Sequence, residues 1–338
     1  MKIILYLTQN YSFEILRPIQ HAAFIKGYSC LWLSGSSDVD VAQFKSDENW
    51  TESFQQAREW CPDAVISPGN NVPEFVRGLK VQVFHGLEWK KKGHFKIRDH
   101  FDLYCTQGPI TTNKFNELAA LHKNFIVRET GWSKLDPLFL SESRPKNKTK
   151  VILYAPTFSE KLTSVVDCFD EIKRISELKD WKWLAKFHPL MNKDIIAKYQ
   201  ALQSDQFQVV DDHSILPLLK SADVMLSDTS SVIGEFLLLN KPVVTYRNSL
   251  PSSALINIHE PGSLESALVS AFEGRDDLRE AINNHNDSLH PYTDGQSSLR
   301  ILNCIEDIVV NKIKPPKKRP INLFRRLKFR KSVGYWRP

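Results

Sequence analysis

Short apolar runs alternate along the chain with longer segments in which apolar residues recur at helical spacing. In the first half, the apolar runs predict strands at residues 2–8, 30–34, 64–67, 81–84 and 103–106, and the spacing predicts helices near 13–26 and 111–122. The pattern restarts after the polar stretch 141–150 and predicts strands at 151–155, 183–187, 208–210, 224–227 and 243–246. Such alternation is typical of parallel sheets covered by helices, so we expect an α/β protein with doubly wound, Rossmann-like domains.

The length of the chain fits two such domains facing each other across a cleft. The chain has 338 residues, and a domain of a two-domain protein has about 150 residues. We expect an N-terminal domain at residues 1–145, a C-terminal domain at 146–311 and a basic tail at 312–338.

The positive charge of the chain is concentrated in this tail. The formal net charge is +6, but residues 312–338 hold eleven Lys and Arg and no Asp or Glu, while residues 1–311 carry 34 basic and 39 acidic groups. Leucine and aromatic residues are interspersed with the basic ones: Leu323, Phe324, Leu327, Phe329, Tyr335 and Trp336. Because polybasic segments bind anionic lipid and aromatic residues insert at the interface, we expect the tail to contact an anionic membrane surface rather than nucleic acid.

Other features of the chain indicate its compartment. The first apolar stretch has only six residues, too short for a signal sequence, and no run of about 18 apolar residues occurs. Five cysteines are scattered without a C-x-x-C pair, which fits a reducing compartment. We therefore expect a cytoplasmic, peripheral membrane protein on the cytoplasmic face.

Ligands of doubly wound sheets bind at the carboxyl ends of the strands, so polar residues there are candidate site residues. The predicted strand 81–84 runs into His85 and Gly86, and Lys90 follows one loop later. A neutral imidazole accepts a proton near pH 7, and lysines suit a phosphate. The alternative is a histidine that caps a strand beside a solvated run of charges.

Two further strand ends carry polar residues. The strand 151–155 is followed by Pro156 and Thr157, and the strand 183–187 ends with Lys186 and His188 before a proline. The hydroxyl and backbone amides near Thr157 are candidates for binding phosphate. Strand-end histidines with nearby lysines thus occur in both halves of the chain.

The stretch "SDTSSVIGEF", residues 227–236, supplies the third element. It predicts a strand that ends at Ser227, a polar turn and an apolar helix at 232–239. The polar turn, made of Asp228, Thr229, Ser230 and Ser231, then lies at a helix N-terminus, whose amides bind anions. The alternative is that Ser230 or Ser231 only caps the helix. Glu235, one turn into the helix, is a candidate partner for a ribose hydroxyl.

Common nucleotide and metal motifs are missing from the sequence. There is no G-x-G-x-x-G and no G-x-x-x-x-G-K-[ST], and the lone acidic pair Asp38 and Asp40 in a polar loop is typical of solvated surface. We expect no metal and no cofactor. The stretch from Asp294 to Arg300 starts the last long helix and is a candidate to add hydroxyls and an arginine to the cleft.

Six blocks of the sequence, in their order, resemble the CDP-glycerol glycerophosphotransferase family, whose members build teichoic-acid and related alditol-phosphate polymers. The blocks are "HGLEWKKKG" at 85–93, "YAPTF" at 154–158, "KFHP" at 186–189, "SDTSSVIGEF" at 227–236, "KPVVTY" at 241–246 and "DG" at 294–295. The resemblance implies a GT-B fold. It departs at Thr229, where the family usually has tyrosine, at Ser159, where the family has arginine, and at Glu235, where an aspartate is common.

The resemblance also implies roles for the candidate residues. His85 matches the family's likely base, and His188, Ser230 and Ser231 match residues that contact the donor pyrophosphate. The full set comprises the catalytic candidates His85 and His188 and the donor-binding candidates Gly86, Lys90, Pro156, Thr157, Lys186, Asp228, Thr229, Ser230, Ser231 and Glu235.

The implied reaction moves glycerol phosphate or ribitol phosphate from a CDP-alditol, the donor substrate, to a hydroxyl of a glycan or lipid-linked acceptor. CMP is released, and the product is a surface polymer such as teichoic acid or capsule. The alternative is a GT-B glycosyltransferase that uses a nucleotide sugar, because such enzymes share the same fold and phosphate site.

Overall fold

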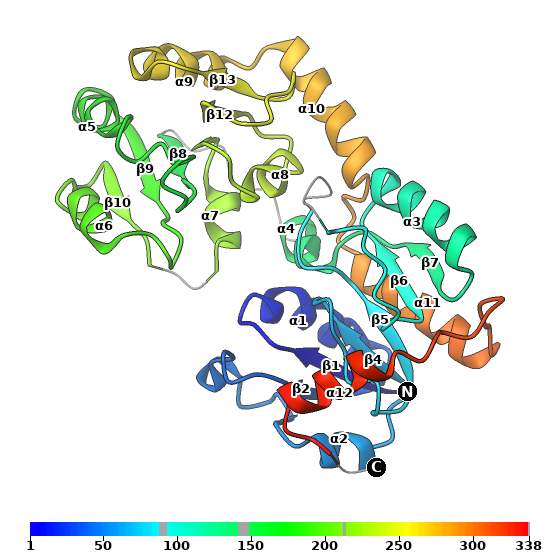
Figure 1. Ribbon diagram of the computed structural model, residues 1–338. Coiled ribbons are helices and arrows are strands. Elements are labelled where there is room, and N and C mark those ends of the chain that lie inside the picture. The colour runs from blue at the N-terminus through cyan, green and yellow to red at the C-terminus, as the bar shows by residue number, and fades with distance from the viewer. Residues whose placement is uncertain (88–92, 141–148, 212–213, 337–338) are drawn as a thin grey trace. The chain divides into compact units, whose positions relative to one another are not determined.

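A computed structural model describes residues 1–87, 93–140, 149–211 and 214–336. The chain divides into two compact units (Figure 1). Unit 1 comprises Met1–Ser141 and Leu289–Pro338, and unit 2 comprises Glu142–Ser288.

Unit 1 is built on a seven-stranded sheet in which every strand pair is parallel. The strand order is β3-β2-β1-β4-β5-β6-β7, the doubly wound order that reverses between β1 and β4. Its strands are β1 (Lys2–Leu7), β2 (Ser29–Ser34), β3 (Trp50–Thr51), β4 (Ala64–Ser67), β5 (Leu79–Gln82), β6 (Leu103–Thr106) and β7 (Ile126–Glu129). The helices are α1 (Ser12–Ile25), α2 (Phe54–Glu59), α3 (Pro109–His122), α4 (Asp136–Leu140), α11 (Ser297–Val310) and α12 (Leu323–Ser332), with 3-10 turns at Val41–Gln43 and Ser133–Leu135.

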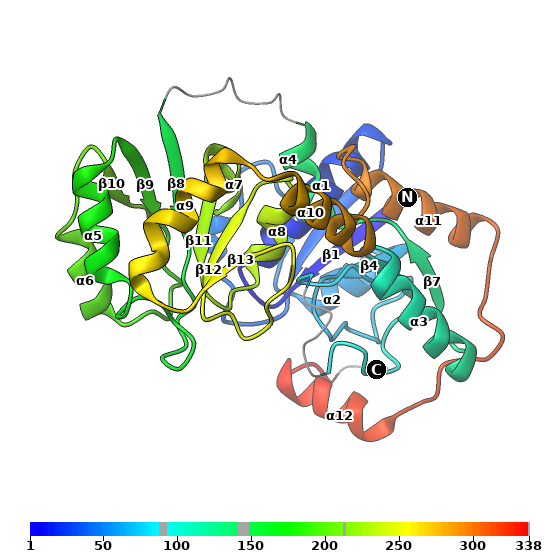
Figure 2. The ribbon, with the colours of Figure 1, turned by 90° about the horizontal axis from the view of Figure 1, so that it is seen from above.

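Unit 2 repeats the same plan with six parallel strands. The order is β10-β9-β8-β11-β12-β13, so the switch point lies between β8 and β11. The strands are β8 (Lys150–Tyr154), β9 (Trp181–Ala185), β10 (Phe207–Val209), β11 (Val224–Ser227), β12 (Val243–Tyr246) and β13 (Ile256–Ile258). The helices are α5 (Phe169–Leu178), α6 (Lys193–Gln200), α7 (Leu216–Ser221), α8 (Val232–Leu237), α9 (Leu264–Glu273) and α10 (Asp276–Leu289), with a 3-10 turn at Pro261–Ser263. The two doubly wound sheets predicted from the sequence are confirmed (Figure 2).

The predicted domain boundaries need one correction. The expected break after residue 145 lies close to the observed division, but residues 289–311 belong to unit 1 and not to the C-terminal domain. The physical reason is the docking of α11, which packs against α1. The buried carboxylate of Asp136 also accepts hydrogen bonds from the backbone N–H groups of Ser297 and Ser298, at 2.9 and 2.7 Å, and so caps α11.

The basic tail also belongs to unit 1. Residues 323–332 form α12, and Phe329, Val333 and Tyr335 pack against the hydrophobic core of this unit. Among the described residues, no helix is both long enough and apolar enough to cross a membrane.

Candidate functional site

The loops that follow β8 and β11 flank the switch point of unit 2 and carry most of the predicted donor residues. Strands β8 and β11 pair directly, with Tyr154 opposite Leu226, so their carboxyl ends lie side by side. Ser227, the last residue of β11, donates a hydrogen bond of 2.7 Å from its hydroxyl to the carbonyl of Ala155. The two loops therefore leave the sheet from one fixed point, the place where doubly wound folds bind ligands.

Asp228 organises both loops from the inside. Its carboxylate is fully buried and accepts hydrogen bonds from the backbone N–H groups of Thr157, Ser164 and Thr229, at 2.9, 2.9 and 2.7 Å. The Ser164 hydroxyl donates a fourth, at 3.0 Å. Burial raises the pKa of Asp228, and these hydrogen bonds oppose the rise. The geometry gives the carboxylate a positioning role, because its acceptor capacity is spent within the protein.

This network changes what the neighbouring amides offer to a ligand. The N–H groups of Thr157 and Thr229 already donate to Asp228, so the expectation that free amides near Thr157 bind phosphate is wrong for that residue. Within the described part of the chain, no hydrogen bond engages the N–H groups of Ser230 and Ser231. Ser231 occupies the N-cap of α8 without a side-chain capping bond, so its hydroxyl does not cap the helix.

His188 lies in the loop that follows β9, beside Lys186. Its Nδ1 accepts a hydrogen bond of 3.1 Å from the backbone N–H of Leu190, which leaves the proton of the neutral ring on Nε2. The ring of Phe158 packs on it with 4.4 Å between centroids. Burial and the charge of Lys186 lower the pKa of His188. The neutral His188 is thus a hydrogen-bond donor at Nε2, which suits a phosphate oxygen.

Sequence reasoning missed several residues that shape this part of unit 2. Asn248, beyond the end of β12, donates from its side chain to the carbonyl oxygen of Asp228, and the Ser249 N–H donates to the Thr229 hydroxyl at 3.1 Å. Phe158, although 41% exposed, packs on His188. The rule that singled out polar residues after strands applies equally to Asn248. Glu235 lies in the first turn of α8 with its side chain buried.

His85 follows β5 and contacts the two loops that flank the switch point of unit 1. Its Nδ1 is 3.3 Å from the carbonyl oxygen of Pro68, in the loop after β4, and its ring is 5.7 Å from that of Tyr11, in the loop after β1. A carbonyl only accepts, so Nδ1 carries the proton of the neutral ring and Nε2 carries the lone pair. The imidazole is exposed and is therefore accessible to a substrate. This tautomer is the one that a base acting through Nε2 requires.

The residue before His85 is held in an unusual conformation. Phe84 has a φ of 58°, a region that bulky side chains rarely adopt and that costs on the order of 1–3 kcal/mol. Its ring is stacked on His94, at 5.3 Å, and meets the edge of Phe115, at 5.1 Å. Its carbonyl accepts a hydrogen bond of 3.2 Å from Nε1 of Trp132. Packing on both sides therefore maintains the turn that presents His85.

The remaining predicted residues fall in different places. Gly86 follows His85, and its carbonyl accepts a hydrogen bond of 2.9 Å from Gln107. Pro156 is buried beside Thr157. Lys90 lies outside the described residues. Ser297 and Ser298 are buried inside unit 1, where their N–H groups donate to the Asp136 carboxylate that caps α11. The expectation that this stretch adds hydroxyls to a ligand site is therefore wrong.

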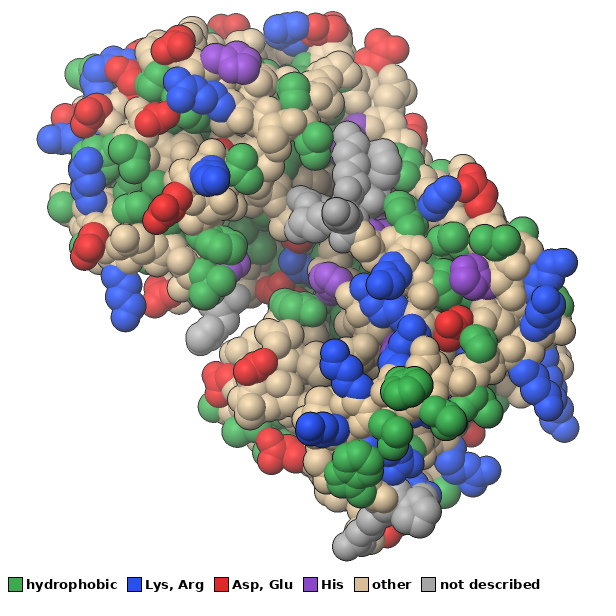
Figure 3. All heavy atoms as spheres, in the orientation of Figure 1, with side chains coloured by type: hydrophobic (Ala, Val, Ile, Leu, Met, Phe, Trp, Pro, Cys, Tyr) green, Lys and Arg blue, Asp and Glu red, His purple; other side chains and the backbone are tan. Residues whose placement is uncertain are grey.

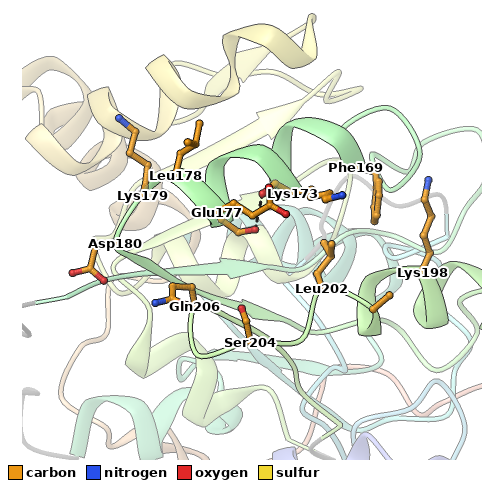
Figure 4. A pocket seen from close by; sticks show the side chains of 12 residues that line it. Phe169, Lys173, Glu177, Leu178, Lys179, Asp180, Lys198, Leu202, Ser204 and Gln206 are labelled. Carbon is orange, nitrogen blue, oxygen red and sulfur yellow. Dashed lines mark hydrogen bonds between the residues drawn. The ribbon is translucent and has the colours of Figure 1, made fainter.

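A cavity of about 810 Å³ in unit 2 lies away from these loops (Figure 4). It is lined by residues of α5 and α6 and by Asp180 and Gln206, which precede β9 and β10. It therefore opens near the amino ends of these strands, opposite to the carboxyl ends where doubly wound sheets bind ligands. In the ranges that the structure describes, no three His, Cys, Asp or Glu side chains come together as metal ligands.

Comparison with solved structures shows what fold these units make. The chain is similar to the wall teichoic acid polymerase TagF, with a TM-score of 0.67 and 16% identity over 92% of this chain and 89% of that one. It is also similar to a UDP-N-acetylglucosamine 2-epimerase, with a TM-score of 0.61 and 14% identity over 95% and 99% of the two chains. At such identities the likeness establishes the fold alone, and the predicted GT-B fold is confirmed.

Relatives found by sequence are enzymes of teichoic acid synthesis. A teichoic acid glycerol-phosphate primase of Bacillus subtilis (strain 168) is 28% identical over 236 residues, which are 63% of this chain and 60% of the relative. A teichoic acid poly(ribitol-phosphate) polymerase of Bacillus spizizenii is 40% identical over 105 residues, 29% of this chain and 16% of the relative. The chain thus matches at most about 60% of the length of these relatives.

A family model described as CDP-glycerol:poly(glycerophosphate) glycerophosphotransferase matches residues 76–252, slightly more than half of the chain. The match includes His85 in unit 1 and the Thr157, His188 and Asp228 loops in unit 2. The resemblance drawn from the six sequence blocks is confirmed. The chain belongs to the CDP-glycerol:poly(glycerophosphate) glycerophosphotransferase family.

Proposed function

We propose that this protein transfers glycerol phosphate or ribitol phosphate from a CDP-alditol to a hydroxyl of a glycan or lipid-linked acceptor. The product is a teichoic acid or capsular polymer. The observation that carries the proposal is the family match, which spans His85 after β5 in unit 1 and the loops that flank the switch point of unit 2. The relatives named as a glycerol-phosphate primase and a ribitol-phosphate polymerase support both donors.

In the proposed reaction, His85 removes the proton of the acceptor hydroxyl through Nε2. The hydroxyl oxygen then forms a bond to the alditol-bearing phosphorus, the bond from that phosphorus to the bridging oxygen of the pyrophosphate breaks, and CMP leaves with the bonding electrons. The Pro68 carbonyl supports this role, because it fixes the proton of the neutral ring on Nδ1.

The donor is held in this proposal by residues of unit 2. His188 donates from Nε2 to a phosphate oxygen, and the N–H groups and hydroxyls of Ser230 and Ser231 bind the charge that grows on CMP. Lys186 contributes positive charge, and Lys90 is proposed to do the same from unit 1. Glu235 is proposed to contact the ribose. Asp228 fixes the backbone of Thr157 and Thr229 and acts on the donor only through these loops.

A test uses purified protein, CDP-glycerol or CDP-ribitol and a glycan acceptor, with CMP release as the readout. Removal of a general base costs about 10²- to 10⁴-fold in rate, so His85→Ala and His85→Gln are both expected to lose activity by that factor. Tyr11→Phe, which keeps the ring beside His85, is the matched control and should retain most of the rate. CMP release at the wild-type rate by His85→Ala would refute the assignment of the base.

Thr229 favours a second candidate, a nucleotide-sugar glycosyltransferase, because this residue departs from the tyrosine usual in the family. The two candidates differ in the donor: a CDP-alditol, which releases CMP, or a UDP-, GDP- or CMP-sugar, which releases UDP, GDP or CMP. The melting temperature of the protein is measured with each donor class, and the nucleotide released from each donor is then identified. Only the donor that binds is expected to raise the melting temperature, because binding stabilises the folded state.

We also propose that the protein binds to the cytoplasmic face of a membrane through the tail 312–338. Eleven basic residues without an acidic one support attraction to anionic lipid. A membrane-bound acceptor would then lie close to the enzyme.

A further inference from the structure

The helix α12 has two opposite faces of different character. Arg326, Phe329, Arg330 and Val333 follow each other at helical spacing and form the inner face, which lies against unit 1. Phe324, Leu327, Lys328 and Lys331 repeat the same spacing and form the outer face, which is exposed. The outer face therefore leaves the large apolar side chains of Phe324 and Leu327 in contact with solvent.

Aromatic packing holds the inner face. The ring of Phe75 lies 6.2 Å from Phe329 and is stacked on Tyr335 at 4.8 Å, and the guanidinium of Arg330 lies 4.7 Å above it. Tyr335 also contacts Phe54, at 6.0 Å, and its hydroxyl accepts a hydrogen bond of 3.1 Å from Arg58. The inner face of the tail thus packs, partly buried, against the core of unit 1.

Ion pairs fasten the same segment at two more points. Nε of Arg326 is 2.6 Å from a carboxylate oxygen of Glu74, whose other oxygen is 2.6 Å from Nδ1 of the buried His100. Nε of Arg319 is 2.9 Å from Asp102, and its guanidinium also donates to the carbonyl of His100. Glu74 lies in the connection from β4 to β5, and His100 and Asp102 lie in the connection from β5 to β6. The acidic residues that bind the tail thus belong to two neighbouring loops of unit 1.

The outer face presents large apolar side chains to the solvent. The exposed fraction is 89% for Phe324 and 51% for Leu327. Elsewhere in the tail, Leu323, Ile321 and Trp336 are exposed by 66%, 68% and 58%. Lysine and arginine side chains lie beside hydrophobic ones over α12 (Figure 3). Exposed aromatic side chains beside lysines, in a tail without Asp or Glu, match the interface of an anionic bilayer, where the rings enter the headgroup region and the cations stay at its surface.

We propose that the outer face of α12 binds an anionic lipid surface while the inner face clamps the helix to unit 1, so that the membrane holds this unit in one orientation. The inference deepens the proposed function, because it assigns lipid binding to one face of one helix. A flexible basic tail would tether the protein without orienting it, whereas a docked helix transmits the plane of the bilayer to the sheet of unit 1.

The test separates the two faces. The full-length protein is sedimented with vesicles of phosphatidylglycerol and phosphatidylethanolamine in equal amounts. Phe324→Ala with Leu327→Ala is expected to weaken binding about tenfold or more, because two inserted side chains are removed without a change of charge. Lys328→Gln with Lys331→Gln should weaken binding and reduce its dependence on salt. Wild-type affinity of the Phe324/Leu327 variant for these vesicles would overturn the proposal.

The contact of the inner face is tested by a substitution in its partner on unit 1, so that the sequence of the tail is unchanged. Glu74→Gln is expected to keep vesicle binding but to speed tryptic cleavage within α12 in the absence of lipid, because the Arg326 clamp is lost. Glu117→Gln is the matched control, since Glu117 forms an exposed ion pair with Lys114 away from the tail, and it should leave cleavage unchanged. Equal cleavage rates in wild type and Glu74→Gln would overturn the clamp.

The outcome does not depend on the transferase reaction. His85→Ala protein should sediment like wild type, so a failure of the donor chemistry leaves the lipid result intact. Equal binding to vesicles of neutral phosphatidylcholine, or stronger binding to duplex DNA than to anionic vesicles at the same salt, would contradict a lipid surface as the partner.

Discussion

The backbone N–H of Leu190 donates to Nδ1 of His188 at 3.1 Å and so determines which nitrogen of this imidazole carries the proton. A donor at Nε2 is what the phosphate contact needs, and loss of one such donor costs about 10²- to 10³-fold in kcat. His188→Gln places an amide N–H near the position of Nε2 and is expected to retain about tenfold more CMP release than His188→Ala. His188→Asn, whose amide lies near Nδ1, should resemble alanine. Equal rates for the Gln and Asn variants would contradict the assignment.

Asp228→Asn is expected to destabilise unit 2 by about 3 kcal/mol, because an amide cannot accept four hydrogen bonds and places its own N–H groups against backbone donors. The free energy of unfolding, measured by urea denaturation, checks this value. Asp223→Asn is the matched control: Asp223 is exposed and accepts from the N–H of Val151, and its loss should cost about 1 kcal/mol or less. A smaller effect at Asp228 than at Asp223 would disprove the organising role.

Trp132→Phe tests the turn that presents His85. The change keeps a ring but removes the N–H that donates to the carbonyl of Phe84, so kcat is expected to fall about tenfold with little change in the KM of the donor. Trp183→Phe is a close control, because Trp183 is equally buried and its Nε1 has no hydrogen-bond partner among the described residues. Steady-state kinetics of both variants are compared. A parallel loss in Trp183→Phe would attribute the effect to general packing.

His290 makes the stability of unit 1 depend on pH. Burial is the main cause that lowers the pKa of His290 to about 4, and Nε2 accepts a hydrogen bond of 2.9 Å from the Trp132 N–H. The unfolded chain binds a proton below pH 6.5 and the folded unit does not until about pH 4, so stability falls as the pH drops through this window, by about 3 kcal/mol.

The free energy of unfolding measured between pH 7 and pH 4 checks this expectation. His290→Gln keeps an acceptor for Trp132 but does not titrate. The free energy of unfolding of this variant should therefore change less with pH than that of the wild type. His21→Gln, at an exposed site, serves as the control and should leave the slope unchanged. An identical slope in wild type and His290→Gln would rule out this source.

Local patterns predicted most of the sheet but not its edges. The buried strands β1, β4, β8 and β11 are continuous apolar runs, and their positions follow directly from the sequence. Three edge strands were missed because their patterns are weak. Strand β3 has two residues and β13, "INI", has three, and β7, "IVRE", is only partly buried and ends in charged residues.

The candidate site was predicted only as far as neighbouring residues define it. The sequence indicated His85 and His188 because both follow strands. It contained no local sign that the Asp228 carboxylate accepts a hydrogen bond from Ser164, 64 residues earlier, or that the Pro68 carbonyl fixes the tautomer of His85. The same limit applies to Asp136 and α11, which meet across about 160 residues of chain.

The return of the chain to unit 1 has a consequence for how the protein is made. Residues 142–288 are synthesised after β7 but before α11, which packs on α1 and supplies Glu306 as a partner of Lys26 at 2.8 Å. A nascent chain that ends before α11 leaves the buried Asp136 and the α1 surface uncovered, whereas unit 2 is already complete and able to fold. Unit 1 is therefore completed only after the whole of unit 2 has been synthesised.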